Sequence, residues 1–192
     1  MKIKVIKGPK LTPNKIPSYV TAIKAKDILS NYSIDYKRES TNWGYQRKPS
    51  DSRLRSMAKK ILKHDVMFPN SILLNVRSDD AVQRVNDEEF DYEPDIHGPF
   101  WVVDGQHRIK SIETAISILK EEENPDLEKI KELENTIFHI SLIFTQQIEF
   151  EIFMFLEINK EAKRVPINLA EEVYYKLAET NAGIQELAYG DT

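Results

Sequence analysis

Cysteine is absent from this chain of 192 residues. Its absence excludes disulfides, thiolate metal sites and a cysteine nucleophile, and it favours a cytoplasmic location. Long apolar runs are also lacking, so no segment is predicted to span a membrane, and the first ten residues, MKIKVIKGPK, lack the apolar stretch of a signal peptide. The four histidines show no metal-ligand spacing, and we therefore expect no metal site.

Acidic residues are scarce in the first third of the chain. Residues 1–64 hold sixteen Lys and Arg against four Asp and Glu, a net charge of +12, whereas residues 65–192 carry a net charge of −16. A separation of this size favours a basic face for a polyanion. The alternative is that the two halves pair with each other inside one fold. A content of 41% hydrophobic and 30% charged residues is typical of a soluble globular protein.

The most informative stretch is WVVDGQHR, at residues 101–108. It begins like the end of a buried strand, passes through a tight Asp-Gly turn, and continues with the apolar spacing of a helix. Because the first N–H groups of a helix are unpaired and the helix dipole is positive there, such a turn suits an anion. Gln106, His107 and Arg108 add an amide, an imidazole and a guanidinium, which fit a phosphate, a nucleotide or a nucleic-acid backbone.

Each residue of this turn also has a purely structural interpretation. Asp104 would cap the following helix, His107 would be a packed ring, and Arg108 would form an ion pair with an acid such as Glu157. The convergence of polar groups after an apolar strand favours the functional interpretation.

The remaining patterns predict an α+β fold with a small mixed sheet. Residues 1–26, which contain three prolines, are expected to form an irregular or short-stranded arm, and the acidic residues 79–95 an exposed loop or hairpin tip. Strands are predicted near 33–36 and over 71–76, 100–103 and 136–144, and helices over 51–63, 106–123, 126–134, 146–159 and 169–179.

The helix predicted at 51–63 has the clearest amphipathic pattern, with apolar residues at 54, 57, 58, 61 and 62. A face of this kind is usually solvated, but its place in the basic third leaves a role in tracking phosphates open. Its basic residues are Arg53, Arg55, Lys59, Lys60 and Lys63. For the helix at 146–159, the residues predicted to face inward are Ile148, Ile152, Phe155 and Leu156.

The order of these motifs resembles the DGQHR-domain family, which includes the DndB proteins of DNA sulfur modification, and more distantly the ParB/sulfiredoxin superfamily. A GYQRKP turn precedes an amphipathic helix, an acidic excursion and the strand that ends in DGQHR. FLEINKEAKRVP, at 155–166, resembles the second signature of the family. The resemblance covers about residues 40–180 and implies a ParB/sulfiredoxin-like fold. It divides the chain into a basic arm with the first strands (1–40), the DGQHR domain (41–180) and a tail (181–192), in either a compact or a truncated member.

The resemblance also implies a phosphate site. In ParB-like folds the DGQHR loop is the phosphate-binding turn, and the turn at Gln46 lies across the same pocket. Sulfiredoxins have a catalytic cysteine where this chain has Gln106, so sulfiredoxin-type reduction is excluded. The residues expected to form the site are Gln46, Arg47, Asp104, Gln106, His107 and Arg108, with Asn159 and Lys160 as contributors from the second signature.

Three functions remain open at this point. The first is a regulator or accessory protein of a phosphorothioation-type DNA-modification system, with DNA and other modification proteins as partners. Its relatives are associated with transcriptional control of the modification genes. Here the basic first third would track phosphates, and Tyr45 and Arg47 would stack or clamp, as would Trp43 unless it belongs to the core.

The second function is a nucleoside triphosphatase of the ParB-like class that uses Mg²⁺. Arg47 and Arg108 would neutralise phosphates, Gln106 would orient water, Asp104 would hold the metal ion, and His107 would act as acid or base. Against it, the chain has no GxxxxGK[ST] motif and only six glycines. The third function is a protein-interaction module in which the DGQHR turn is structural. A homo-oligomer is compatible with all three.

Overall fold

The computed structural model describes residues 1–11, 16–37, 44–64, 68–78, 81, 83–86 and 88–161. The residues up to Leu156 belong to one compact unit, and a second unit begins at Glu157. Trp43, the helix predicted at 169–179 and the expected tail lie outside the described residues. The boundaries expected after residues 40 and 180 therefore stay predictions.

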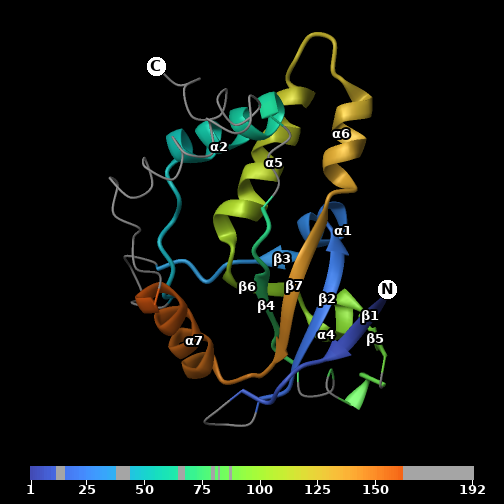
Figure 1. Cartoon of the computed structure of the whole chain (residues 1–192), viewed down its shortest axis with the longest axis vertical. Coiled ribbons are helices and arrows are strands. Elements are labelled where there is room, and N and C mark those ends of the chain that lie inside the picture. The colour runs from blue at the N-terminus through green and yellow to red at the C-terminus, as the bar shows by residue number, and fades with distance from the viewer. Residues whose placement is uncertain are drawn as a thin grey trace, which may run out of the picture. The chain divides into compact units, whose positions relative to one another are not determined.

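Within the described residues, seven strands form one mixed sheet in the order β3-β6-β4-β7-β2-β1-β5 (Figure 1). β3 lies parallel to β6 and β4 lies parallel to β7, whereas the other neighbours are antiparallel. The strands are β1 (Lys2–Lys7), β2 (Ser18–Lys24), β3 (Tyr32–Ser33), β4 (Ile72–Val76), β5 (Glu89–Asp91), β6 (Phe100–Asp104) and β7 (Ile137–Phe144).

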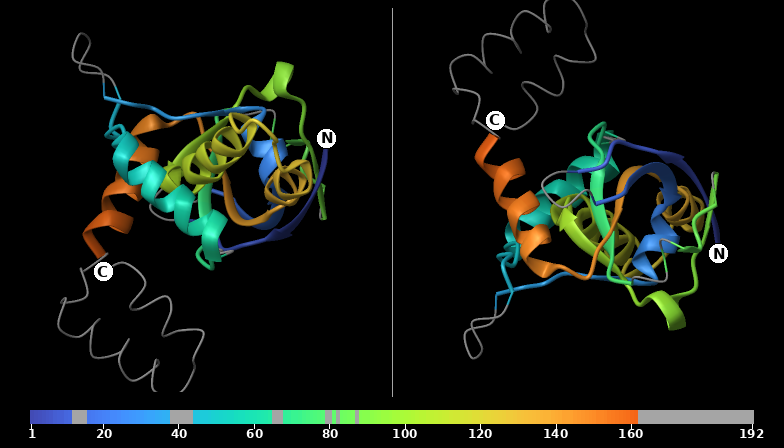
Figure 2. Two further views of the ribbon diagram at one scale, coloured as in Figure 1. Left: turned by 90° about the horizontal axis from the view of Figure 1, so that it is seen from above. Right: turned by 90° about the horizontal axis from the view of Figure 1, so that it is seen from below.

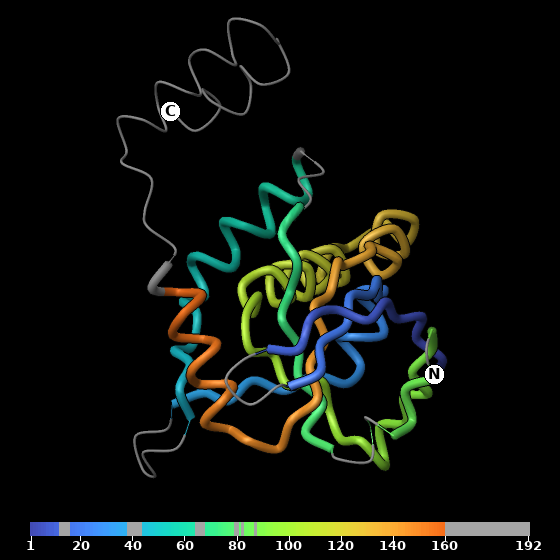
Figure 3. Tube along the Cα trace, turned by 60° about the horizontal axis from the view of Figure 1, so that its bottom comes forward, coloured from blue at the N-terminus to red at the C-terminus, as the bar shows by residue number. Residues whose placement is uncertain are grey.

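The helices of the described residues cover the central strands. α2 packs against α5, and α5 also contacts α1 and α6, an arrangement seen from above and below in Figure 2 and as a trace in Figure 3. The sheet and helices together confirm the predicted α+β class. The helices are α1 (Ala25–Leu29), α2 (Asp51–His64), α4 (Pro94–His97), α5 (Gln106–Lys120), α6 (Leu127–Glu134) and α7 (Ile148–Glu161).

Most elements with a strong apolar pattern match their predictions. The bounds of α2, β4, β6, α6 and β7 agree to within one residue. α5 ends at Lys120 instead of residue 123, because no apolar side chain follows Leu119 in the polar run that comes next. In α2, Leu54, Ala58 and Ile61 are buried, and every basic residue of its predicted face is exposed.

The prediction of an irregular or short-stranded arm at the N-terminus was wrong in its detail. β1 and β2 are regular strands of six and seven residues that belong to the main sheet. β2 pairs along its whole length with β7, and Ile3, Val5 and Ile23 lie in the core. In β1 the lysines alternate with buried residues as in a strand, but the three prolines between β1 and β2 favoured an irregular arm.

The acidic segment is not simply an exposed loop. It contributes β5, which pairs with β1, and the short helix α4. Phe90 and Tyr92 are buried in the core, where the Tyr92 ring stacks on Phe100 with centroids 4.2 Å apart. Two buried aromatic side chains therefore anchor a segment whose composition indicated solvent exposure.

α7 presents a different face to the sheet from the one predicted. Ile148, Ile152 and Phe155 are half-buried, whereas Leu156 is 56% exposed. The fully buried positions near the start of the helix are Phe150 and Glu151. The apolar pattern placed Glu151 outward, but buried polar partners on the sheet hold it inward.

Candidate functional site

The DGQHR turn joins the end of β6 to the start of α5. Gly105 is the N-cap of α5, with a φ of 102°. A Cβ at this position would lie 2.9 Å from Ile72 Cγ1 and 3.1 Å from Arg108 Nη2. Both the left-handed backbone and the close packing therefore require glycine in the motif.

The start of α5 has two open backbone donors. The N–H groups of Arg108 and Ile109 donate to the carbonyl of Gly105, at 3.0 and 3.2 Å. Within the described residues, the N–H groups of Gln106 and His107 have no acceptor, and no side chain caps the helix. Asp104 is therefore not the helix cap that the structural interpretation proposed. Two free N–H groups at the positive end of a fifteen-residue helix can accept an anion.

Arg108 turns back onto the protein. Its Nη1 donates to the carbonyls of Asn70 and Ser71 at 2.7 and 2.9 Å, and its Nη2 donates to Asp104 Oδ2 at 2.6 Å. The acid that pairs with Arg108 is thus Asp104, one helical turn away. In this conformation Arg108 ties the turn to the start of β4, and its charge is balanced within the motif.

Gln46 lies beside the same turn. Its Nε2 donates to the carbonyl of Val102 at 2.5 Å, and the backbone of Gln46 pairs with Tyr36 in an isolated parallel bridge. Gln46 and Gln106 are both at least nine-tenths buried, and the Oε1 atom of each has no partner in the described part of the chain. The turn at 46 is therefore brought to β6, as the family resemblance implied. The two unsatisfied amide oxygens leave hydrogen-bonding capacity there.

His107 and Arg53 bring α2 into the site. Burial, and next the nearby Arg53 guanidinium, lower the pKa of His107, while Asp104 acts in the opposite direction. The first turn of α2 therefore lies next to the first turn of α5. The exposed basic face of α2 continues from that point. Arg47, another predicted phosphate ligand, is also exposed.

The two predicted contributors from the second signature, Asn159 and Lys160, belong to a different unit from the turn. Asn159 is exposed on α7 but belongs to the unit that begins at Glu157, and the side chain of Lys160 is outside the described residues. Their contribution to the site stays a prediction.

Sequence reasoning missed a second polar cluster, centred on Glu151. Arg77 Nε donates to Glu151 Oε1 at 2.7 Å, and Arg77 Nη2 donates to Glu151 Oε2 at 2.6 Å and to Asp35 Oδ2 at 2.9 Å. Trp101 lies under the guanidinium, with its ring centroid 3.6 Å away. Asn75 Nδ2 donates to Glu151 Oε1 at 2.5 Å, so both carboxylate oxygens accept bonds at full burial. We call these five residues the Arg77–Glu151 cluster.

This cluster holds the segment that carries Gln46. The hydroxyl of Tyr45 donates to Glu151 Oε2 at 3.1 Å, and burial followed by the charge of Glu151 raises the pKa of Tyr45. The pKa of Arg77 is raised as well: burial lowers it, but Glu151 and Asp35 together outweigh that effect. The available signal was an asparagine inside the apolar strand SILLNV.

The described residues show neither a metal-binding cluster nor a membrane-spanning helix. No group of three or more His, Cys, Asp or Glu side chains there could hold a metal ion. No described helix is both long and apolar enough to cross a membrane.

Comparison with known proteins identifies the family. Residues 8–189 match the model of DndB, described as DNA-sulfur modification-associated. The chain belongs to the DndB family. No curated protein matches it. Among solved structures, it is similar to the C-terminally truncated chromosome-partitioning protein ParB from Caulobacter crescentus complexed with CTP-gamma-S, with 12% sequence identity and a TM-score of 0.52 over 90% of this chain and 72% of that chain. The fold is therefore ParB-like, as the sequence resemblance implied.

Proposed function

We propose that this DndB-family chain is an accessory or regulatory protein of a phosphorothioation-type DNA-modification system and that it binds DNA phosphates where α5 begins. The observation that carries the proposal is the pair of open N–H groups of Gln106 and His107 beside Arg53. Helix N-termini and arginines bind phosphates through directed N–H donors and positive charge. Family membership supplies the DNA-modification context.

The basic face of α2 extends this site into a surface. Its five basic side chains are exposed along one helix that packs on α5. A DNA strand with one phosphate bound at the turn would therefore place further phosphates along α2. Contacts of this kind give affinity and register without sequence specificity. Other modification proteins are the expected further partners, and a cytoplasmic location follows from this role.

The test is duplex DNA binding measured by fluorescence anisotropy as a function of salt. Lys59→Ala combined with Lys63→Ala removes two exposed charges of α2, and the slope of log K against log salt should decrease by about 2. The matched control is Lys120→Ala with Lys131→Ala, which removes the same charge from α5 and α6. Absence of binding, or an equal loss in both variants, would contradict the proposal.

A nucleotide is the second candidate ligand for the same turn. The specific support is the buried, unpartnered Oε1 of Gln106 beside open N–H groups, together with a fold neighbour whose structure holds CTP-gamma-S. A bound Mg²⁺ would come with the triphosphate. Hydrolysis would then use His107 as acid or base.

Thermal shifts with each of the four triphosphates, with and without Mg²⁺, test this candidate. Arg47→Ala and Arg53→Ala should each abolish a shift, because each removes a guanidinium expected to bind phosphate. Both residues are exposed, so the core stays intact. Lys131→Ala is the control. Arg108→Ala is a poor probe, since Arg108 ties the turn to β4 and its loss would destabilise the fold. If both variants keep the shift produced by one triphosphate, that nucleotide binds elsewhere on the protein.

A further inference from the structure

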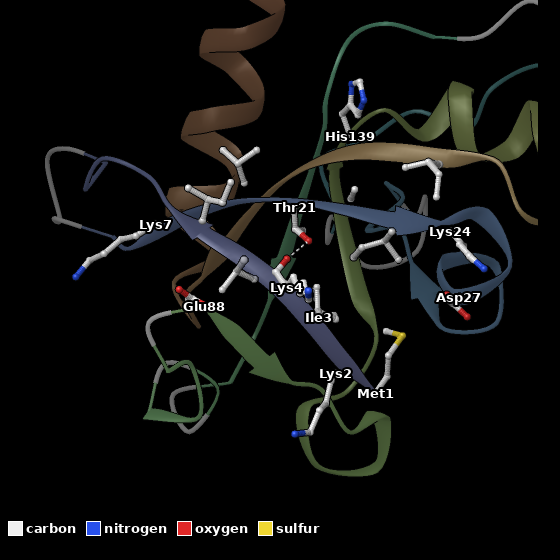
Figure 4. A pocket seen from close by; sticks show the side chains of 16 residues that line it. Met1, Lys2, Ile3, Lys4, Lys7, Thr21, Lys24, Asp27, Glu88 and His139 are labelled. Carbon is white, nitrogen blue, oxygen red and sulfur yellow. Dashed lines mark hydrogen bonds between the residues drawn. The ribbon is translucent and has the colours of Figure 1, made fainter.

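The outer face of β1, β2 and the first half of β7 is uncovered and basic. Its exposed lysines and aliphatic residues form what we call the lysine face, defined by Lys2, Lys4, Lys24, Ile6, Val20 and Ile137. Figure 4 shows Lys2, Lys4 and Lys24 on these strands. Ile6 is 73% exposed, Val20 51% and Ile137 50%. Ile6 lies opposite Val20, and Ile137 opposite Lys24, so aliphatic side chains from three strands lie next to lysines on this face. Asp27 and Glu88 also line this face.

Divergence of two strands hollows this face. β1 pairs with β2 only at Val5–Lys7 and with β5 at Lys2–Lys4. Figure 4 shows the strands separating beyond the hydrogen bond from Thr21 Oγ1 to the carbonyl of Lys4, which measures 2.5 Å. The result is a shallow depression with an apolar floor and a cationic rim, which is the usual anatomy of a protein-binding surface.

The same molecule carries a surface of the opposite character. Residues 121–128, which join α5 to α6 and begin α6, are all exposed. They include a single aliphatic side chain, Leu127, which is 73% exposed although it begins a helix. We call this segment the acidic tip, and its acids are Glu121, Glu122, Glu123, Asp126 and Glu128.

We propose that the lysine face of one copy of this chain binds the acidic tip of a second copy. The carboxylates of the tip would meet the lysine rim, and Leu127 would enter the depression between Ile6, Val20 and Ile137. Figure 1 shows the α5–α6 loop and β1 far apart in the molecule, so one copy does not make this contact with itself. The contact is head-to-tail, and each copy offers one face and one tip.

A polypeptide suits this face better than a nucleic acid does. A duplex bound through its phosphates would contact only the lysines and would leave Ile6, Val20 and Ile137 without an apolar partner. Exposed aliphatic side chains gain instead from burying another aliphatic side chain. The proposal rests only on these two surfaces and is independent of the phosphate site.

Sedimentation velocity on the whole chain tests it at concentrations from about 10 μM to about 1 mM, the range of weak protein contacts. The weight-average sedimentation coefficient should rise with concentration at low salt, and the rise should shrink at about 0.5 M salt because the charges are screened. A wild-type chain that stays monomeric throughout overturns the proposal.

Charge reversal identifies the two surfaces. Lys4→Glu with Lys24→Glu, and separately Glu122→Lys with Glu123→Lys, should each abolish association, and an equimolar mixture of the two variants should restore it. All four side chains are exposed, so folding is retained, which circular dichroism checks. Lys59→Glu with Lys63→Glu is the matched control, since it changes net charge equally on α2 and should still associate.

Two further outcomes would overturn the assignment. One is an equal loss of association in the control, which would make it an effect of net charge alone. The other is a mixture that stays monomeric, which would show that the face and the tip do not meet. Loss of duplex DNA binding in Lys4→Glu with Lys24→Glu, without any self-association, would assign the face to DNA instead.

Discussion

Two arginine–carboxylate pairs in this protein differ in how they are built. In the DGQHR turn, Arg108 pairs with Asp104, four residues away, and the Asp104 carboxylate is 33% exposed. In the Arg77–Glu151 cluster, Arg77 joins Glu151 and Asp35, which lie 74 and 42 residues away in the chain. The first pair shapes one turn, whereas the second holds three distant segments against the sheet. The two pairs consist of the same kinds of residue, but Glu151 is fully buried and Asp104 is not. We therefore expect the loss of Glu151 to lower the free energy of unfolding more.

The largest predicted effect is that of Glu151→Ala. Removing this carboxylate leaves Arg77, Asn75 and Tyr45 without their shared acceptor at a fully buried position. The free energy of unfolding should fall by about 3–5 kcal/mol, measured by urea denaturation. Glu149→Ala, an exposed change two residues earlier on the same helix, should stay within about 0.5 kcal/mol. Similar costs for the two variants would show that the cluster contributes nothing.

Arg108→Ala should have an intermediate effect. It leaves the carbonyls of Asn70 and Ser71 and the carboxylate of Asp104 without their donor, but these groups are partly reached by water. We expect a loss of about 2 kcal/mol in the free energy of unfolding. Arg55→Ala on the exposed face of α2 is the control. A cost as large as that of Glu151→Ala would remove the distinction between the two pairs.

Tyr45→Phe tests a single hydrogen bond to Glu151 of the cluster. It deletes one hydroxyl donor to Glu151 and keeps the ring that packs on Phe155, with centroids 5.2 Å apart. A loss of about 1 kcal/mol is expected in the same denaturation assay, because Arg77 and Asn75 still satisfy the carboxylate. Combined with Glu151→Ala, the second change should add almost nothing, since the bond is already gone.

The smallest predicted effect is the pH dependence that His107 gives to the turn. Its pKa in the folded protein lies below the ordinary histidine value of 6.5, so the unfolded chain binds more protons just below that pH. This contribution to stability is complete above pH 6.5 and is lost as the pH falls through the lowered pKa. Arg53→Ala should raise that pKa, as followed by NMR of the imidazole, and His107→Gln should remove the slope. An unchanged imidazole titration in Arg53→Ala would contradict the juxtaposition of α2 and α5.

Much of the fold was accessible from local patterns. α2, β4, β6, α6 and β7 each carry an apolar periodicity within their own segment, and a segment of this kind folds in much the same way wherever it packs. β1 and β2 were misjudged because three prolines lie between them, and β5 because acids dominate the segment around it. Their strand pairing depends on partners far away in the chain, such as β7 for β2. The orientation of α7 failed for the same reason, since the pattern could not anticipate partners for Glu151.

The DGQHR turn, its glycine and the family follow from local sequence alone, because they depend on neighbouring residues and on backbone conformations that only certain residues adopt. The packing of distant segments determines which polar groups at this turn lack a hydrogen-bond partner among the described residues. It turned Arg108 inward, placed Arg53 near His107 and, among the described residues, left two N–H groups without an acceptor. It also built the Arg77–Glu151 cluster, since the desolvation of a carboxylate and the position of its partners are set by packing and have no local signature in the chain.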